Sequence, residues 1–141
     1  MNSTTGLEKT FLDSNILIYL IDKDEAKKAK VESLLNPQFV ISTQVIAENV
    51  NACLKKLKLP QEKSFHHGNF LLTHFQVIPV AARFFPIAFE LALTYQFSFW
   101  DSLIVASALE SECEILFSED MHDGLRVKGK LTILNPFKLT N

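Results

Sequence analysis

Four acidic residues that lie far apart in the chain share one kind of local setting. Asp13 interrupts an apolar run and is followed at once by two small polar residues. Glu48 lies in the first turns of a predicted helix, Asp101 opens a strongly apolar helix, and Asp120 follows a short apolar strand. In an open parallel sheet the strand ends meet at one edge, where the following helices begin. We therefore expect these four carboxylates to converge on one pocket.

Carboxylates that are brought together repel one another and take up protons unless a cation balances them. Mg²⁺ or Mn²⁺ suits such a site because both ions prefer oxygen ligands and bind through a few carboxylates, waters and substrate phosphate. The four histidines show no HExxH or HxH spacing, so the sequence offers no zinc alternative. An acidic site with such an ion is typical of phosphoryl-transfer chemistry, in which a metal-activated water attacks phosphorus.

Each acid also has a purely structural interpretation. Asp13 is a good helix N-cap, Glu48 could be a solvated helix residue, and Asp120 could belong to a turn. Asp101 closes the capping box Ser98-Phe99-Trp100-Asp101. However, Asp101 shares its helix row with the apolar residues 104, 105 and 108, and an unpaired carboxylate on a core-facing row is costly. A bound cation would resolve that conflict.

Other polar residues near the acids could support the site. Asn15 and Ser118 lie two residues from Asp13 and Asp120, where each could orient a carboxylate or a water. Asp123 is a second candidate for the fourth acid, although its place before Gly124 is typical of a turn. Three basic residues follow the acidic turn and could hold a nucleic-acid backbone: Arg126, Lys128 and Lys130.

Hydrophobic periodicity predicts alternating strands and helices. Strands are expected over 9–13, 38–42, 76–80, 114–117 and 130–134, and helices over 14–21, 24–35, 44–58, 61–74, 81–96 and 98–113. This alternation predicts an α/β fold, a three-layer α/β/α domain with a four- or five-stranded parallel sheet. We expect a flexible N-terminal lead over 1–8, a single domain over 9–137 and a C-terminal tail over 138–141.

Composition limits the class of protein. The chain has 141 residues, of which 48% are hydrophobic, enough for one domain with a single core. A net charge of −2 argues against a surface that is basic overall and binds nucleic acid by its general charge. Only local basic patches could bind it. Cys53 and Cys113 lack metal-type spacing and are expected to be buried thiols in a reducing compartment. With neither a signal peptide nor a bilayer-length apolar run, the sequence predicts a cytoplasmic protein with no membrane partner.

These motifs together resemble the PIN domain family, and most closely its VapC-type toxin ribonucleases. The resemblance spans roughly residues 9–137 and rests on four motifs in order: residues 11–17 with Asp13, 42–48 with Glu48, 100–108 with Asp101 and 116–121 with Asp120. The closing segment 133–137 is also similar. Ser118 stands where the family often has threonine, so the hydroxyl is kept.

The resemblance implies an endoribonuclease that depends on Mg²⁺ or Mn²⁺ and hydrolyses RNA phosphodiester bonds. Asp13 and Asp101 would be the main metal ligands, and Glu48 and Asp120 would complete the acidic site. It further implies a homodimer and a cognate antitoxin protein, as in a type II toxin–antitoxin system.

Three other interpretations remain open at this stage. The chain could be a PIN nuclease of RNA processing without an antitoxin, or a non-catalytic interaction module whose acids are only caps. A doubly wound phosphatase or dehalogenase with Asp13 as nucleophile is disfavoured, because such sites usually have a second aspartate two residues on, where this chain has Asn15.

Overall fold

The structure is a computed structural model that describes residues 8–139. Strands and helices alternate along it as the sequence predicts. The strands are β1 (Thr10–Leu12), β2 (Val40–Ser42), β3 (Gln76–Ile78), β4 (Ile115–Phe117), β5 (Arg126–Val127) and β6 (Leu131–Leu134). The helices are α1 (Ser14–Leu17), α2 (Glu25–Leu34), α3 (Thr43–Lys55), α4 (Gln61–His74), α5 (Phe84–Tyr95) and α6 (Phe99–Glu110), with 3-10 turns η1 (Ile18–Leu20) and η2 (Pro136–Lys138).

The strands form one mixed sheet in the order β3-β2-β1-β4-β6-β5. Five of them run parallel, as expected, and β5 adds a sixth strand that pairs antiparallel with β6. Sequence patterning does not predict β5, because it has only two residues and so offers no alternation to detect.

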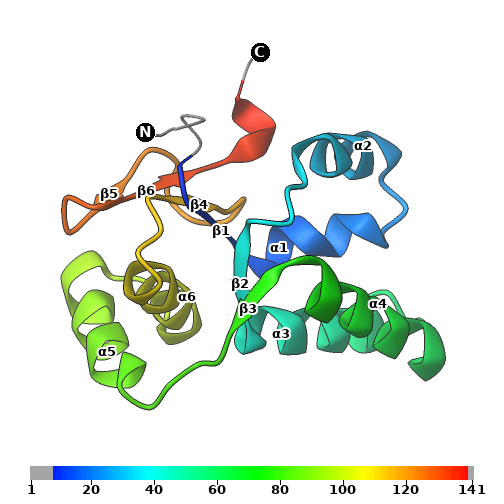
Figure 1. Cartoon of the computed structure of the whole chain (residues 1–141), viewed down its shortest axis with the longest axis horizontal. Helices are drawn as coiled ribbons and strands as arrows, with labels where there is room; N and C mark the ends of the chain where they lie inside the picture. Colours follow the sequence, from blue (N-terminus) through cyan, green and yellow to red (C-terminus); the bar gives the residue numbers. More distant parts are fainter. Residues whose placement is uncertain (1–7, 140–141) are drawn as a thin grey trace.

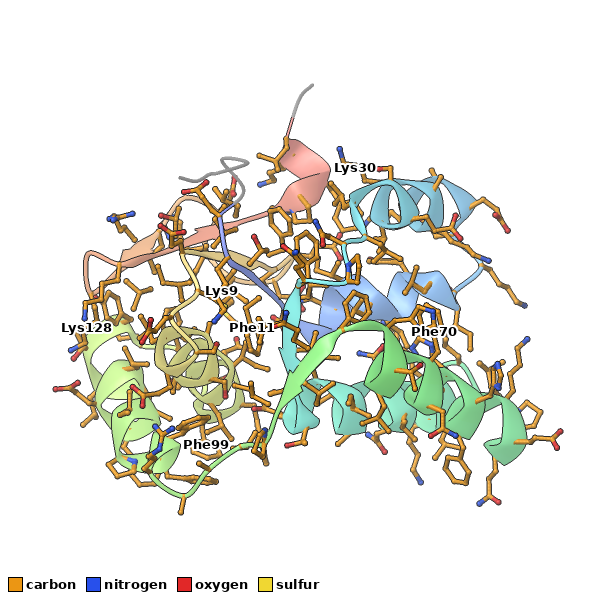
Figure 2. The ribbon with its side chains drawn as sticks, viewed as in Figure 1. Lys9, Phe11, Lys30, Phe70, Phe99 and Lys128 are labelled. Atoms are coloured by element: carbon orange, nitrogen blue, oxygen red, sulfur yellow. The ribbon has the colours of Figure 1, made fainter. Side chains whose placement is uncertain are left out.

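Helices cover both faces of this sheet (Figure 1), which gives the three predicted layers. Helices α5 and α6 lie together on one face, and α1 to α4 lie on the other. The chain leaves β1 toward β2 and later returns to β4 on the opposite side of β1. A topological switch point therefore lies between β1 and β4, the place where open α/β sheets bind ligands. Phe11 of β1 is fully buried between the layers (Figure 2).

Helices α3 and α4 pack closely because α4 has a glycine at the contact. A Cβ placed on Gly68 would lie 2.8 Å from Val50 Cγ2, closer than side-chain carbons approach. The next residue back, His67, is buried and its Nε2 lies 2.9 Å from Asn49 Oδ1 of α3. The α4 helix thus fixes α3, the helix that carries Glu48.

Several element ends differ from the predicted ones. Helix α3 begins at Thr43, one residue earlier than predicted, with Ser42 as its cap, and α2 begins at Glu25, with Asp24 as its cap through a hydrogen bond from the Lys27 N–H. Both predicted cysteines are buried free thiols. The predicted lead over 1–8 and tail over 138–141 fall largely outside the described residues. Over residues 8–139, none of the helices is long and apolar enough to cross a membrane.

Candidate functional site

Asp13 stands at the switch point, between the end of β1 and the start of α1. Its Oδ1 caps the helix by accepting a 2.7 Å hydrogen bond from the Ser14 N–H. The side chain is only 4% exposed. The cap interpretation of Asp13 is therefore correct, and it leaves the second carboxylate oxygen, Oδ2, to face the neighbouring strand.

Ser118 and Asn15 hold that second oxygen. Ser118 follows β4, and its Oγ donates a 2.9 Å hydrogen bond to Asp13 Oδ2. Asn15 Nδ2 lies 3.4 Å from both Asp13 Oδ2 and Ser118 Oγ, and its Oδ1 accepts from the Glu119 N–H at 3.1 Å. The two residues expected to orient a carboxylate are thus both in contact with Asp13.

Glu48 reaches the same edge from α3. Its Oε1 accepts a 2.7 Å hydrogen bond from Ser14 Oγ, which ties it to the residue that follows Asp13. Its Oε2 accepts from Gln44 Nε2 at 3.0 Å, and the same nitrogen donates to the Trp100 carbonyl at 3.1 Å. Glu48 is therefore linked to α1 on one side and to α6 on the other, and it is not a freely solvated residue.

Asp101 lies in the first turn of α6, where Ser98 is the N-cap and accepts a 3.1 Å hydrogen bond from the Asp101 N–H. The predicted capping residue is thus confirmed, and the Asp101 side chain is only half-buried. Burial raises the pKa of Asp101, and the negative charges of Asp120 and Glu48 raise it further, while Ser98 lowers it.

Asp120 and Asp123 have different environments although both lie in the turn after β4. Asp120 is exposed and its charge acts on Asp101. Asp123 instead accepts a 2.7 Å hydrogen bond at Oδ1 from the Asn135 N–H, which fastens the turn to the end of β6. The geometry therefore favours Asp120 as the fourth acid and gives Asp123 a structural contact.

The acidic site, which we define as Asp13, Glu48, Asp101 and Asp120, carries unbalanced negative charge. Burial raises the pKa of Asp13 to about 7, and the charges of Asp101 and Glu48 add to this, against the lowering by the hydrogen bonds from Ser118 and Ser14. Within residues 8–139 the ion pairs are Lys27–Glu119, Arg83–Glu110 and Lys128–Glu90, and none of them includes a member of the acidic site.

The turn that carries Ser118 and Asp120 is anchored to the neighbouring helix. Tyr19 Oη donates to Glu119 Oε1 at 2.7 Å, and Lys27 of α2 forms an ion pair with the same carboxylate. The Lys27 ammonium also lies 4.9 Å from the ring centre of Phe137. These contacts fix the turn at the edge of the sheet.

The three basic residues expected near the site are not brought to it. Strand β6 runs parallel to β4, so its C-terminal end, Leu134, lies beside Phe117 at the acidic edge. The turn between β5 and β6 is at the opposite end of the sheet. Arg126 bonds to Thr132 and the Gly129 carbonyl, and Lys128 pairs with Glu90 of α5 (Figure 2). Lys130 lies in the same turn, so the placement does not support these residues as a backbone clamp beside the acids.

Sequence reasoning missed four polar residues that hold the site together. Ser14 bridges Asp13 and Glu48, and Gln44 bridges Glu48 and α6. Asn49 donates to the Ser14 carbonyl at 3.0 Å, and His67 contacts Asn49. The spacing of Gln44 and Glu48 is the i, i+4 spacing of neighbours on a helix and could have revealed that pair. The Asn49–His67 contact joins two helices and has no local sequence signal.

The donor chemistry of the acidic site fits a hard divalent cation. Its four acidic residues would bind a metal ion through carboxylate oxygens. Such a cation would also stabilise the buried, unbalanced charge of Asp13. Among the residues that the structure describes, no three His, Cys, Asp or Glu side chains are close enough to enclose an ion. Mg²⁺ is an ion of this kind, because it prefers oxygen ligands and binds through a few carboxylates and waters.

Comparison with known proteins agrees with this architecture. A family model described as "PIN domain" matches residues 10–126, which is most of the chain, and the chain therefore belongs to the PIN domain family. No curated protein sequence matches the chain.

Solved structures with the same fold include toxins and toxin–antitoxin complexes. A toxin–antitoxin complex from Klebsiella pneumoniae is 23% identical, with a TM-score of 0.69 over 93% of this chain and 100% of the other. VapBC2 from Rickettsia felis, bound to a promoter DNA fragment, is 22% identical, with a TM-score of 0.67 over 89% and 97%. VapC20 from Mycobacterium tuberculosis, a sarcin–ricin loop cleaving toxin, is 17% identical, with a TM-score of 0.67 over 79% and 90%.

Proposed function

We propose that this chain is a metal-dependent endoribonuclease that hydrolyses RNA phosphodiester bonds. The observation that carries the proposal is the convergence of Asp13, Glu48, Asp101 and Asp120 at the switch point of the sheet, with no balancing ion pair in the described part of the chain. Such a charge cluster destabilises the fold unless a cation is bound. The position of this charge cluster at a ligand-binding edge is best explained by a hydrolysis reaction that needs a bound cation.

Each acid would have a distinct part in holding that ion, Mg²⁺ or Mn²⁺. Asp13 and Asp101 would be the main ligands, because Asp13 is buried, Asp101 is half-buried, and burial together with the neighbouring carboxylates raises the pKa of both. Glu48 and Asp120 would complete the site, directly or through water. When bound, the ion would activate a water and stabilise charge on the phosphate.

The surrounding residues of the chain would orient these groups. Ser118 and the Ser14 N–H fix the two oxygens of Asp13 in one orientation, and Asn15 joins Asp13 to the turn after β4. Gln44 and Ser14 hold the two oxygens of Glu48. A preorganised set of carboxylates pays little reorganisation when substrate arrives, which is what efficient hydrolysis requires.

Purified protein should cut single-stranded RNA with Mg²⁺ or Mn²⁺ and stop in chelator. The variant Asp101→Asn keeps the shape and part of the cap geometry but removes one charge, and we expect it to lose cleavage. The control variant Asp123→Asn, in the turn after β4 that also carries Asp120, should retain most of it. Cleavage that continues in chelator, or that survives Asp101→Asn, would refute the proposal.

We further propose that the chain is the toxin of a type II toxin–antitoxin pair, active in the cytoplasm as a homodimer. The support is that neighbours of the same fold from Klebsiella pneumoniae and Rickettsia felis were solved as complexes with antitoxins. A neighbouring gene for a short DNA-binding protein is therefore expected. Its product should bind this chain on co-purification and stop RNA cleavage.

A PIN nuclease of RNA processing is the competing proposal, because the catalytic chemistry would be the same. Expression in a bacterial host separates the two. A toxin should arrest growth, co-expression of its neighbour should restore it, and Asp101→Asn should not arrest growth. Normal growth with active enzyme present would favour the processing role. Light scattering of the purified protein tests the homodimer.

A further inference from the structure

Trp100 exposes a large aromatic surface beside the acidic site. It directly precedes Asp101, and its residue is 61% exposed, which is unusual for a tryptophan. Phe99 supports it from the side, with ring centres 5.1 Å apart and planes at 69°. Phe99 in turn lies 6.0 Å from Phe85 and from Phe89 of α5 (Figure 2). The indole is thus held in position by packed neighbours while it stays open to a ligand.

Trp100 lines a shallow, open surface cavity that also includes Glu48 of the acidic site. The cavity has a volume of about 510 Å³ and is lined by Trp100, Glu48 and six further residues: Thr43, Gln44, Ala47, Asn51, Val80 and Leu103. Its size is within the range of roughly 300–1,000 Å³ that is usual for small-ligand sites. Because Glu48 belongs to both, a group in this cavity lies next to the acids.

Gln44 lines this cavity and has a buried acceptor without a partner. The side chain is 92% buried, and its Nε2 donates to Glu48 Oε2 and to the Trp100 carbonyl. Because both partners are acceptors, the amide nitrogen must face them, which leaves Oε1 on the other side. Gln44 Oε1 is buried and has no hydrogen-bond partner among the described residues. A buried acceptor without a partner costs free energy, and because this atom is fully buried, a ligand N–H or O–H would reach it after a small shift of the Gln44 side chain, which the new hydrogen bond would favour.

We propose that this cavity binds one unpaired base of the RNA, next to the phosphate that is cut. The base stacks on Trp100 and donates an exocyclic or ring N–H to Gln44 Oε1. This deepens the proposed ribonuclease function and rests on it. Aromatic stacking suits a chain with net charge −2 and an acidic site, because it does not depend on the attraction of phosphate to positive charge. A base inside a duplex has both faces covered, so the cavity selects single strands.

Trp100 is the only tryptophan of the chain, so its fluorescence reports on this cavity alone. We would mix the full-length protein with hexaadenylate and Mg²⁺ in a stopped-flow instrument and record quenching before the strand is cut. The matched control is a six-unit abasic strand with the same phosphates and charge. Saturable quenching by hexaadenylate alone supports the proposal. Equal quenching by both strands, or none by either, overturns it.

Variants then separate stacking from fold. Trp100→Ala should raise KM for RNA about tenfold, the loss expected for one base–aromatic stack, with a smaller change in kcat. Trp100→Tyr should restore most of that KM. Phe65→Ala, a half-exposed aromatic on α4 that does not line the cavity, should leave KM unchanged. If Trp100→Ala instead dissociates an oligomer and leaves KM alone, the indole is a protein interface and the proposal is wrong.

The Gln44 contact is tested from the substrate side, because replacing Gln44 would also release Glu48. A hexanucleotide of purine riboside lacks the amino group of adenine but keeps its stacking face. It should bind several times more weakly than hexaadenylate, and equal binding would remove Gln44 from base recognition. Quenching without any RNA cleavage would refute the ribonuclease while supporting base binding. RNA cleavage without quenching would support the ribonuclease and refute base binding at Trp100.

Discussion

Charged side chains have different surroundings at the two ends of the central sheet. At the β5–β6 turn, the charged side chains are exposed and have partners: Lys128 pairs with Glu90 at 3.0 Å, and Arg126 donates to Thr132 and Gly129. At the acidic edge, Asp13 is buried among like charges, and its hydrogen bonds come from neutral hydroxyl, amide and backbone groups. Charge at the first end is exposed to water, and that of Lys128 is paired with Glu90.

The difference shows which charges the fold needs and which it tolerates. An exposed pair such as Lys128–Glu90 contributes about 0–1 kcal/mol, so the fold neither gains nor loses much from it. A buried carboxylate without a counter-ion costs more and persists only where something outside the fold compensates. Unbalanced charge is therefore a better guide to the site than the number of charged residues.

The largest expected effect is at Asp13. In Asp13→Asn the isosteric amide removes the buried negative charge, so RNA cleavage should fall by more than about a hundredfold. In chelator at pH 8 the same variant should be more stable than the parent, on the order of 1–3 kcal/mol, because no buried anion remains. Cleavage assays and thermal melts measure the two effects. A variant that is both inactive and less stable would show that Asp13 serves the fold.

A smaller loss is expected at Ser118, which touches the acid without being one. Ser118→Ala removes the 2.9 Å hydrogen bond to Asp13 Oδ2, so cleavage should fall about 10–100-fold. Ser118→Thr keeps the hydroxyl and should restore most activity. Unchanged activity in Ser118→Ala would mean that the backbone alone orients Asp13.

His67, which contacts Asn49 of α3, makes the stability of the fold depend on pH. Burial lowers the pKa of His67 below its usual 6.5, with the charge of His66 adding to this. The unfolded chain therefore takes up this proton before the folded chain does, and the stabilisation is complete above about pH 6.5 and is lost as pH falls.

Replacing His67 by glutamine should make the free energy of unfolding fall less steeply between pH 6.5 and 5 than in the parent. The difference in slope is at most about 1.4 kcal/mol per pH unit. Denaturant titrations at several pH values measure it. A slope equal to that of the parent would show that His67 does not cause this dependence.

The smallest effect is expected at the opposite end of the sheet. Lys128→Ala removes an exposed, partnered charge and should change the free energy of unfolding by less than about 0.5 kcal/mol. RNA cleavage should be unaffected, because the turn lies away from the acids. A clear loss of cleavage would restore Arg126, Lys128 and Lys130 as nucleic-acid contacts.

Sequence patterns were sufficient for most of the fold, because each helix and parallel strand has its own apolar periodicity. Helix α4 has the predicted bounds, and the five parallel strands are where expected. The convergence of the acids followed from one rule about strand ends and needed no side-chain detail. The side-chain hydrogen bonds between residues far apart in the sequence could not be predicted. Asp13, for example, is a helix cap and also accepts a hydrogen bond from Ser118, 105 positions away.

The misplaced basic residues show the limit of reasoning by proximity in sequence. Arg126 is only six positions after Asp120, yet the hairpin formed by β5 and β6 carries it to the far end of the sheet. The antiparallel pairing that does this involves two residues of β5, too few to leave a pattern. Similarly, the link from His67 through Asn49 to Ser14 joins three helices and depends on how α3 and α4 pack.

The close contact at Gly68 has a practical consequence for handling this protein. A methyl group there would press on Val50, so Gly68→Ala should loosen α4 from α3 by about 1–3 kcal/mol and lower the melting temperature without altering any acid. Such a change could yield a conditional form, active in the cold and unfolded in the warm. The gene could then be propagated in the warm with its product unfolded, and the folded protein obtained by cooling.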